Sequence, residues 1–267
     1  MNINPASMIH PNRSRFVDRH VLVSGGAAGV GAEAVRLFAA EGARVSIVDI
    51  QDAAGTALSE EVMEAGGEAI FVRADVSSGQ EVSHALGVAN ERFGTVDILY
   101  NHAGSTIVKP FLDTSYEEWR RLFAINVDSM YFMTHGVLPG MLAKGKGVIV
   151  NTSSVSAVLA TPMEVLYCTS KGACQMFTRS IATEYRDQNI RCNAVCPGFI
   201  RTAHGLREID ALKAYGVDVT EAAIAELQGR ICEPVEIARA ALFLASDDAS
   251  FVNGETLYVD NGLMART

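Results

Sequence analysis

Short apolar runs alternate with longer amphipathic stretches over most of the chain. A strand that helices cover on both faces is apolar along its whole length, whereas each covering helix has only one apolar face. The alternation therefore predicts an α/β fold with a parallel sheet and crossover helices. The predicted strands span 20–24, 44–50, 68–74, 96–101, 147–152, 190–196 and 256–259. The predicted helices span 29–41, 53–65, 80–93, 116–142, 165–186 and 235–245.

The chain has no internal repeat, low-complexity tract or linker composition that would divide it. Its 267 residues suit one large α/β domain better than two small ones. We therefore expect a single domain over 16–267, preceded by a polar N-terminal arm over 1–15. A helical insert at about 203–229 follows the sixth strand and is a candidate substrate loop.

The chain is acidic, because 22 Lys and Arg oppose 31 Asp and Glu for a net charge of −9. Nucleic acids and anionic membranes bind clustered positive charge, so neither is an expected partner. No stretch approaches the roughly 18 apolar residues of a membrane span, and the first residues lack the apolar segment of a secretory signal. A cytoplasmic location is expected. The cysteines form no paired framework, which predicts reduced thiols and no metal site; they are Cys168, Cys174, Cys192, Cys196 and Cys232.

A glycine-rich loop joins the first strand to the first helix, with the sequence SGGAAGVG over 24–31. Glycine permits positive φ and lets the backbone approach a ligand closely. The free N–H groups and the positive dipole end of the following helix suit a pyrophosphate. The strand–loop–helix context predicts a dinucleotide site, and the residues assigned to it are Ser24, Gly25, Gly29, Val30 and Gly31.

Two acidic residues end the next two strands. Asp49 lies 18 residues after Gly31, where a carboxylate accepts hydrogen bonds from the adenosine ribose. A 2′-phosphate there would meet like-charge repulsion, and no Arg or Lys lies in the loop or just after Asp49 to offset it. NAD is therefore expected rather than NADP. Asp75 ends the third strand and either hydrogen-bonds near the adenine or caps the following helix.

Tyr167 and Lys171 are four residues apart in a predicted helix, so their side chains share one face. A nearby ammonium favours the phenolate. Lowering a tyrosine pKa from about 10 by about 3 units takes roughly 4 kcal/mol, which a close Lys and a positively charged nicotinamide ring are expected to supply. Ser154 follows the fifth strand, 13 residues before Tyr167, at the edge where open α/β sheets bind ligands. Ser154 and Tyr167 are expected to hold a substrate oxygen while a hydride moves to or from the carbon.

Taken in order, these motifs resemble those of the short-chain dehydrogenases/reductases, from about Arg15 to Met264. The family's Thr-Gly-x-x-x-Gly-x-Gly loop matches 24–31, with Ser in place of Thr. Its Asn-Asn-Ala-Gly element matches 101–104, where His102 is the departure and has no assigned role. Its Tyr-x-x-x-Lys pair matches Tyr167 and Lys171, with Ser154 at the family's spacing. The Asn that completes the catalytic tetrad matches Asn126.

The resemblance implies a role for each member of this tetrad. Tyr167 exchanges a proton with the substrate oxygen, and Lys171 lowers the pKa of Tyr167 and bonds the nicotinamide ribose. Ser154 positions the substrate, and Asn126 supports a water that relays protons to Lys171. Beyond these residues and the loop, Asp49 and Asp75, the implied cofactor contacts are Val76, Asn101, Ala103, Gly104, Pro197, Gly198, Ile200 and Thr202.

The resemblance also implies an architecture. The family has a doubly wound (Rossmann) sheet of seven parallel strands in a three-layer αβα arrangement, commonly assembled as a homotetramer. The helices that carry Asn126 and Tyr167 would form one interface and the last strand another.

Substrate contacts are expected from 155–166 and the insert, with help from 105–111. The first of these segments is largely apolar, which suggests a hydrophobic or neutral secondary alcohol or ketone; its apolar members are Val155, Val158, Leu159, Met163 and Leu166. The insert carries polar side chains that either bind a carboxylate or face solvent, namely His204, Arg207, Lys213 and Tyr215.

Two other functions fit the same scaffold. A 3-oxoacyl-[acyl-carrier-protein] reductase would require NADPH and a basic docking patch, and Asp49 disfavours NADPH. A non-catalytic dinucleotide-binding protein would typically lack part of the tetrad, whereas all four residues are present. The preferred hypothesis is therefore an NAD-dependent enzyme that interconverts a secondary alcohol and a ketone.

Overall fold

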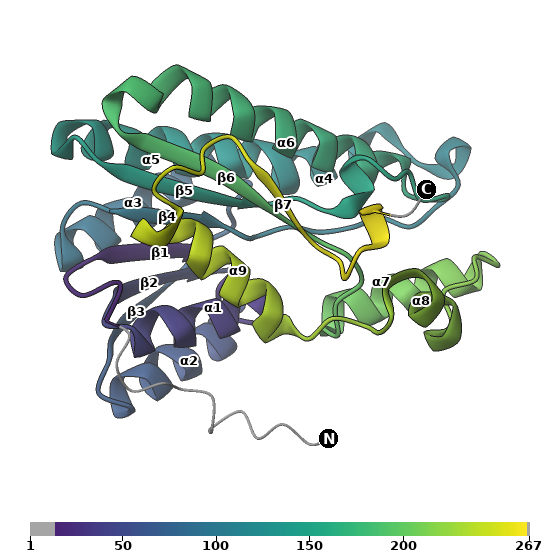
Figure 1. Ribbon diagram of the computed structural model, residues 1–267, viewed down its shortest axis with the longest axis horizontal. Helices are drawn as coiled ribbons and strands as arrows, with labels where there is room; N and C mark the ends of the chain where they lie inside the picture. The colour runs from purple at the N-terminus through teal and green to yellow at the C-terminus, as the bar shows by residue number, and fades with distance from the viewer. Residues whose placement is uncertain (1–13, 266–267) are drawn as a thin grey trace.

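Seven parallel strands form the centre of the computed structural model, which describes residues 14–265 (Figure 1). The strands follow the order β3-β2-β1-β4-β5-β6-β7, so the direction of winding reverses between β1 and β4. Their bounds are β1 His20–Ser24, β2 Arg44–Asp49, β3 Glu68–Arg73, β4 Ile98–Asn101, β5 Gly147–Thr152, β6 Ile190–Pro197 and β7 Thr256–Val259. The predicted doubly wound sheet is confirmed. Most of the polar arm expected over 1–15 lies outside the described residues.

Helices cover both faces of this sheet and make the three predicted layers (Figure 1). One face packs against α1, α2 and α9, and the other against α3, α5 and α6. The helix bounds are α1 Gly29–Ala40, α2 Asp52–Glu64, α3 Gly79–Phe93, α4 Tyr116–Phe123, α5 Ser129–Lys144, α6 Val165–Tyr185, α7 Ala203–Ala214, α8 Glu221–Gln228 and α9 Pro234–Ala245.

Successive strand residues enter different cores, which explains the unbroken apolar runs. Val21 and Val23 pack into the core under α1, whereas Leu22 between them packs into the core under α3 and α5. All three are fully buried, and each such side chain stabilises the fold by about 1.5–3 kcal/mol. A polar residue at any of these positions would be buried on one face or the other.

The predicted helix over 116–142 is not continuous. α4 ends at Phe123, one π-helical turn spans Ala124–Asp128, and α5 then begins at Ser129. The π turn contains Asn126, whose side chain is buried and bonds to residues outside the helix. Insertions of this kind occur frequently at functional sites.

The strand register brings the predicted site residues to one edge of the sheet. Ser24 of β1 lies beside Asn101 of β4, and Asn101 lies beside Asn151 of β5. These positions are the carboxyl ends of the strands on either side of the point where the winding reverses, where open α/β sheets form their ligand crevice. No helix within residues 14–265 has the length and apolar character needed to cross a membrane.

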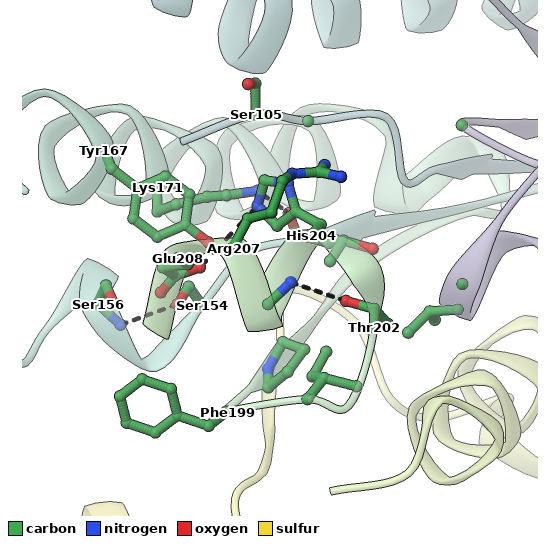
Figure 2. Close-up of a pocket in the computed structure, with 18 of the residues that line it drawn as sticks. Ser105, Ser154, Ser156, Tyr167, Lys171, Phe199, Thr202, His204, Arg207 and Glu208 are labelled. Carbon is green, nitrogen blue, oxygen red and sulfur yellow. Dashed lines mark hydrogen bonds and ion pairs between the residues drawn. The ribbon is translucent and has the colours of Figure 1, made fainter. Parts of the chain in front are cut away.

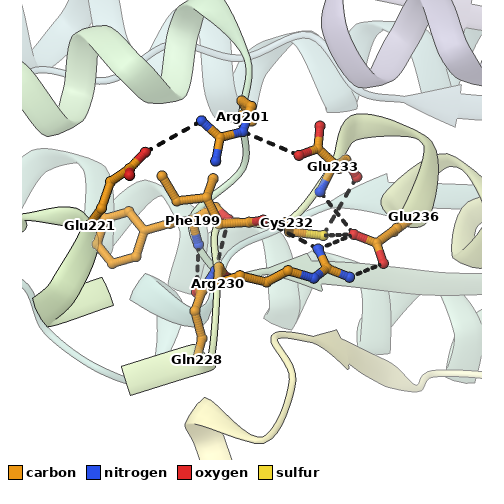
Figure 3. Close-up of polar contacts among 9 residues, drawn as sticks. Phe199, Arg201, Glu221, Gln228, Arg230, Cys232, Glu233 and Glu236 are labelled. Carbon is orange, nitrogen blue, oxygen red and sulfur yellow. Dashed lines mark hydrogen bonds and ion pairs between the residues drawn. The ribbon is translucent and has the colours of Figure 1, made fainter. Parts of the chain in front are cut away.

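The insert forms two helices, α7 and α8, beyond that edge (Figure 1). Polar contacts fasten its base to β6 and α9 (Figure 3). The Gln228 side chain accepts a hydrogen bond from Phe199 N and donates one to Phe199 O, each 2.9 Å long. Arg201 lies 3.6 Å from Glu221 of α8 and 3.2 Å from Glu233 before α9. The insert is therefore held over the crevice from one end.

Candidate active site

A cavity of about 670 Å³ lies at the carboxyl edge of the sheet, between the strand ends and the insert (Figure 2). Nearly all residues predicted to contact the cofactor line it; the exceptions are Ser24, Gly31 and Asn101. Ser24 Oγ instead accepts hydrogen bonds from the backbone of His102 and Ala103, at 3.2 and 3.3 Å. Asn101 Nδ2 donates to Asn151 Oδ1 at 2.9 Å. These side chains hold the cavity floor together and do not face the cavity.

The glycine loop has the backbone geometry that a pyrophosphate cradle requires. Gly25 and Gly29 have φ of +67° and +54°, values that favour glycine. A Cβ on Gly31 would lie 2.0 Å from the carbonyl oxygen of Gly25, so the loop closes only over glycine. No side chain caps the N-terminus of α1, which leaves its first N–H groups free to bind an anion. The described residues thus fit the phosphates of a dinucleotide.

Asp49 lines the cavity at the end of β2 in a fixed orientation. Its two carboxylate oxygens accept hydrogen bonds from Ala27 N and Gln51 N, both at 3.0 Å. Its neighbours on the cavity wall, Ile50 and Gln51, carry no positive charge. This end of the cavity therefore presents a negative charge with acceptor capacity for hydroxyl groups.

Asp75 also lines the cavity, but it does not cap α3. The cap is Ser78, whose side chain accepts a hydrogen bond from Glu81 N, so the capping alternative for Asp75 was wrong. Asp75 accepts hydrogen bonds from Ser77 and lies 3.2 Å from Arg121 Nη2. Burial raises the pKa of Asp75, but these hydrogen bonds outweigh that effect and hold its pKa below the usual value.

The four tetrad residues converge beside Gly104. Tyr167 and Lys171 lie one turn apart on α6, with Lys171 Nζ 5.6 Å from the Tyr167 ring centroid (Figure 2). Lys171 Nζ donates to Thr152 O at 2.9 Å, and Ser154 lies close enough to the Tyr167 side chain to lower its pKa. Tyr167, Lys171 and Ser154 all line the cavity.

Asn126 lies behind the cavity wall. Its Oδ1 accepts a hydrogen bond from Ser105 N at 2.8 Å, and its Nδ2 donates to Ser105 O and to Ser170 Oγ, both at 2.9 Å. A Cβ built on Gly104 would lie 3.5 Å from both Asn126 Oδ1 and Lys171 Nζ. The π turn therefore places Asn126 where it supports the Lys171 end of the tetrad.

Comparison with known proteins identifies the family. The family model described as enoyl-(acyl carrier protein) reductase matches residues 25–264. Cyclopentanol dehydrogenase from Comamonas sp. (strain NCIMB 9872) is 38% identical over 251 residues, which cover 94% of this chain and 99% of that one. The chain belongs to the short-chain dehydrogenase/reductase family. Membership makes the protein an oxidoreductase that acts on CH–OH groups and binds a nicotinamide dinucleotide.

Solved structures of the same family show the same fold. Levodione reductase superposes with a TM-score of 0.90 at 32% identity, covering 95% of this chain and 100% of that one. Gluconate 5-dehydrogenase from Burkholderia cenocepacia J2315, solved in complex with NADP and tartrate, gives a TM-score of 0.86 at 30% identity, covering 96% and 99%.

The departure from the family's Asn-Asn-Ala-Gly element, His102, is half-buried and lines the cavity. His102 Nδ1 lies 3.0 Å from Thr152 Oγ1 and 3.4 Å from the Tyr100 hydroxyl. Burial, reinforced by the positive charge of Lys171, lowers the pKa of His102 to about 3. The imidazole is therefore neutral at physiological pH and serves as a hydrogen-bonded part of the cavity floor.

The expected lowering of the Tyr167 pKa is not found in the protein alone. Burial raises the pKa of Tyr167 well above its ordinary value, and the negative charge of Glu208 raises it further. Lys171 is itself buried, which lowers the pKa of its ammonium group. The prediction from helical spacing considered the attraction between the pair and left out the cost of removing both groups from water.

Two acidic residues of the site were missed by the sequence analysis. Glu164 begins α6, three residues before Tyr167, and its side chain is only 1% exposed. Glu208 lies on α7 and lines the cavity. Neither belongs to a recognised motif. The spacing of Glu164 from Tyr167 was the one available signal, since it places Glu164 about one helical turn before Tyr167.

The polar residues of the insert divide into two groups. His204 and Arg207 line the cavity, whereas Lys213 and Tyr215 are exposed away from it. Burial lowers the pKa of His204 to about 4. The solvent-facing alternative therefore holds for Lys213 and Tyr215, and also for Arg207, which is exposed although it borders the cavity; only His204 is partly buried against it.

Proposed function

We propose that the protein interconverts a secondary alcohol and the corresponding ketone, with NAD as its cofactor. The observation that carries the proposal is the placement of Tyr167, Lys171 and Ser154 on one cavity wall, next to the glycine cradle. When bound, a nicotinamide dinucleotide would supply the hydride acceptor for the alcohol or the hydride donor for the ketone. Within the chain, the loop residues Gly25 and Gly29 would hold the pyrophosphate.

The tetrad residues bind the substrate oxygen and transfer its proton. Ser154 Oγ and the Tyr167 hydroxyl hold the substrate oxygen, and in the oxidation direction Tyr167 takes up the proton of the alcohol. Lys171 stabilises the phenolate form of Tyr167, which its own positive charge favours. Asn126 keeps this end of the site in place through Ser105 and Ser170. A positively charged nicotinamide ring, when bound, would add to the charge of Lys171 in favouring the Tyr167 phenolate against the effect of burial.

The preference for NAD rests on Asp49. Its carboxylate is fixed by Ala27 N and Gln51 N and lines the cavity beside the uncharged Ile50 and Gln51, whereas Arg121 on the same cavity is paired with Asp75. It accepts hydrogen bonds from ribose hydroxyls and repels a 2′-phosphate. A 3-oxoacyl-carrier-protein reductase working with NADPH would have to overcome this repulsion. Titration of NAD and NADP, followed by kcat/KM for each, tests the preference directly.

A screen of secondary alcohols and ketones, read at the nicotinamide absorbance, tests the reaction. Acetoacetyl-CoA with NADPH is included to detect the reductase alternative. Tyr167→Phe is expected to lower turnover by about 10²–10⁴-fold, because it removes a general acid–base group. Tyr116→Phe is the matched control, since Tyr116 is 68% exposed on α4. Full activity in Tyr167→Phe would show that the catalytic assignment is wrong.

We further propose that the enzyme is a cytoplasmic homotetramer. Exposed apolar side chains on the outer helices support self-association, with Tyr131 of α5 and Met176 of α6 at 53% and 59% exposure. The five cysteines are free, as expected in a reducing compartment. Light scattering coupled to size exclusion would give four times the chain mass; a monomer mass would refute the assembly.

A further inference from the structure

We propose that Glu208 recognises a second hydroxyl group on the substrate, so that the substrate is a neutral diol or hydroxyketone and not a simple alcohol. The inference rests on the proposed alcohol chemistry at Tyr167 and names its substrate class. Two observations support it. The carboxyl group of Glu208 lies on the wall of the cavity, and the buried carboxyl group of Glu164 lies behind it.

Glu208 reaches the cavity from the insert. It lies on α7, and its side chain is 15% exposed and lines the same cavity as Tyr167 and Ser154. Figure 2 shows its carboxyl group next to the hydroxyl end of Tyr167. The two groups are near enough for the charge of Glu208 to raise the pKa of Tyr167. A substrate whose reacting oxygen is bound by Tyr167 therefore extends past Glu208.

Glu164 supports Glu208 from behind. Glu164 is fully buried and does not line the cavity. Thr106 Oγ1 donates to Glu164 Oε1 at 3.5 Å. Glu164 and Glu208 lie close enough for the charge of Glu164 to raise the pKa of Glu208. Two neighbouring carboxyl groups repel each other when both are ionised, which favours a proton on one of them. Burial raises the pKa of Glu164 to about 7 and that of Glu208 to about 8, which keeps a proton on the pair near neutral pH.

Glu208 retains unused hydrogen-bonding capacity. Among residues 14–265, no side-chain or backbone donor lies within hydrogen-bond range of the Glu208 carboxyl group; His204 Nε2, one helical turn earlier, is 3.9 Å from Glu208 Oε2. The Glu208 side chain is 15% exposed and lines the cavity, so its carboxyl group is accessible to a ligand there. A hydroxyl group on the substrate satisfies it, because a hydroxyl both donates and accepts.

The rest of the cavity favours a neutral ligand. Its substrate half is walled by apolar side chains, among them Val155, Leu159 and Leu227. Lys171 and Arg207 line the same cavity and disfavour an ammonium group, although Glu208 alone would accept one. A neutral carbon skeleton with two oxygens fits these walls better than an amino alcohol does.

The test compares alcohols that share one skeleton. We would measure kcat/KM for cyclohexanol, for cyclohexane-1,2-, 1,3- and 1,4-diol, and for 2-aminocyclohexanol, in the enzyme loaded with its preferred nucleotide. The wild type is expected to favour at least one diol over cyclohexanol by tenfold or more, since a site built to bond a hydroxyl discriminates strongly against its absence. Glu208→Ala should reduce that ratio to below threefold, and Glu208→Gln, which still hydrogen-bonds, should retain part of it.

Asp210→Ala is the matched control, because Asp210 is an exposed acid on the same helix and does not line the cavity. It should leave the ratio unchanged. Equal kcat/KM for cyclohexanol and every diol in the wild type would overturn the inference. A preference of the wild type for the amino alcohol would also overturn it. So would an equal loss of kcat/KM on all substrates in both Glu208 variants. A wild type that oxidises no alcohol at all would instead refute the proposed function.

Discussion

Replacing Glu164 with Gln should remove a specific loss of stability at high pH. Burial raises the pKa of Glu164 from 4.5 to about 7 in the folded protein. The folded state therefore keeps a proton in a pH range where the unfolded chain has released it. The contribution of Glu164 to the free energy of unfolding is greatest below pH 4.5 and declines as the pH rises. Above about pH 7 that contribution is lost in full. The difference between the two pKa values corresponds to about 3 kcal/mol.

Urea denaturation of the wild type and Glu164→Gln at pH 5 and pH 9 measures this contribution. The wild type should lose about 2–3 kcal/mol more than the variant between these pH values. Other carboxyl groups titrate in both proteins and cancel in the comparison. Without a negative charge at position 164, Glu208 ionises more easily in the variant, which flattens the variant's pH dependence further.

Glu226→Gln serves as the control for this measurement, because Glu226 is exposed on α8. It should follow the wild-type pH dependence. A difference of less than about 1 kcal/mol between the wild type and Glu164→Gln would refute the reasoning, since it would mean that Glu164 is ionised in the folded protein at neutral pH.

Three further outcomes are expected. Glu208→Gln removes a negative charge that raises the pKa of Tyr167, so the acid limb of the pH profile of kcat/KM should move to lower pH. If the midpoint of that limb stays where it is in the wild type, the charge of Glu208 has no effect on the Tyr167 pKa. Asp49→Asn should lower the ratio of kcat/KM with NAD to that with NADP by at least about tenfold, and an unchanged ratio would remove the basis for NAD preference. Gly31→Ala places a Cβ 2.0 Å from Gly25 O and should weaken NAD binding by at least about tenfold in a fluorescence titration. Gly87→Ala adds a Cβ in open space on α3 and should instead raise the free energy of unfolding by about 0.5–1 kcal/mol.

Sequence patterns predicted the sheet well because burial on both faces leaves an apolar run within each strand. The runs at β1, β5 and β7 were predicted with the bounds that the structure has. These strands are easy to predict because their alternate residues pack into two different cores. A run such as Val21–Val23 is therefore apolar throughout. β4 begins at Ile98 and not at Val96, since Asp97 binds the backbone of His20 through its side chain and lies outside the ladder.

Other features depend on contacts between distant parts of the chain and were therefore not predicted. The π turn at Asn126 exists because its side chain bonds Ser105 and Ser170, which no local pattern encodes. The pairing of Glu164 with Glu208 joins residues 44 positions apart, from the start of α6 and from the insert. In the sequence each of them looks like an ordinary helical glutamate.

The charges around Tyr167 come from α6 and α7 and connect the proposed substrate recognition to the proposed catalysis. The positive charge of Lys171 favours the phenolate form of Tyr167, whereas a negative charge on Glu208 raises the pKa of Tyr167. This opposition is small while Glu208 carries a proton, and when Glu208 is ionised a substrate hydroxyl that donates to it partly screens its charge. A diol would thus be bound more tightly and would also meet a more easily ionised Tyr167, whereas a simple alcohol would leave the charge of Glu208 beside the catalytic tyrosine. Discrimination at Glu208 should therefore be visible in kcat as well as in KM, because the group that recognises the second hydroxyl also sets the acidity of the group that takes the proton.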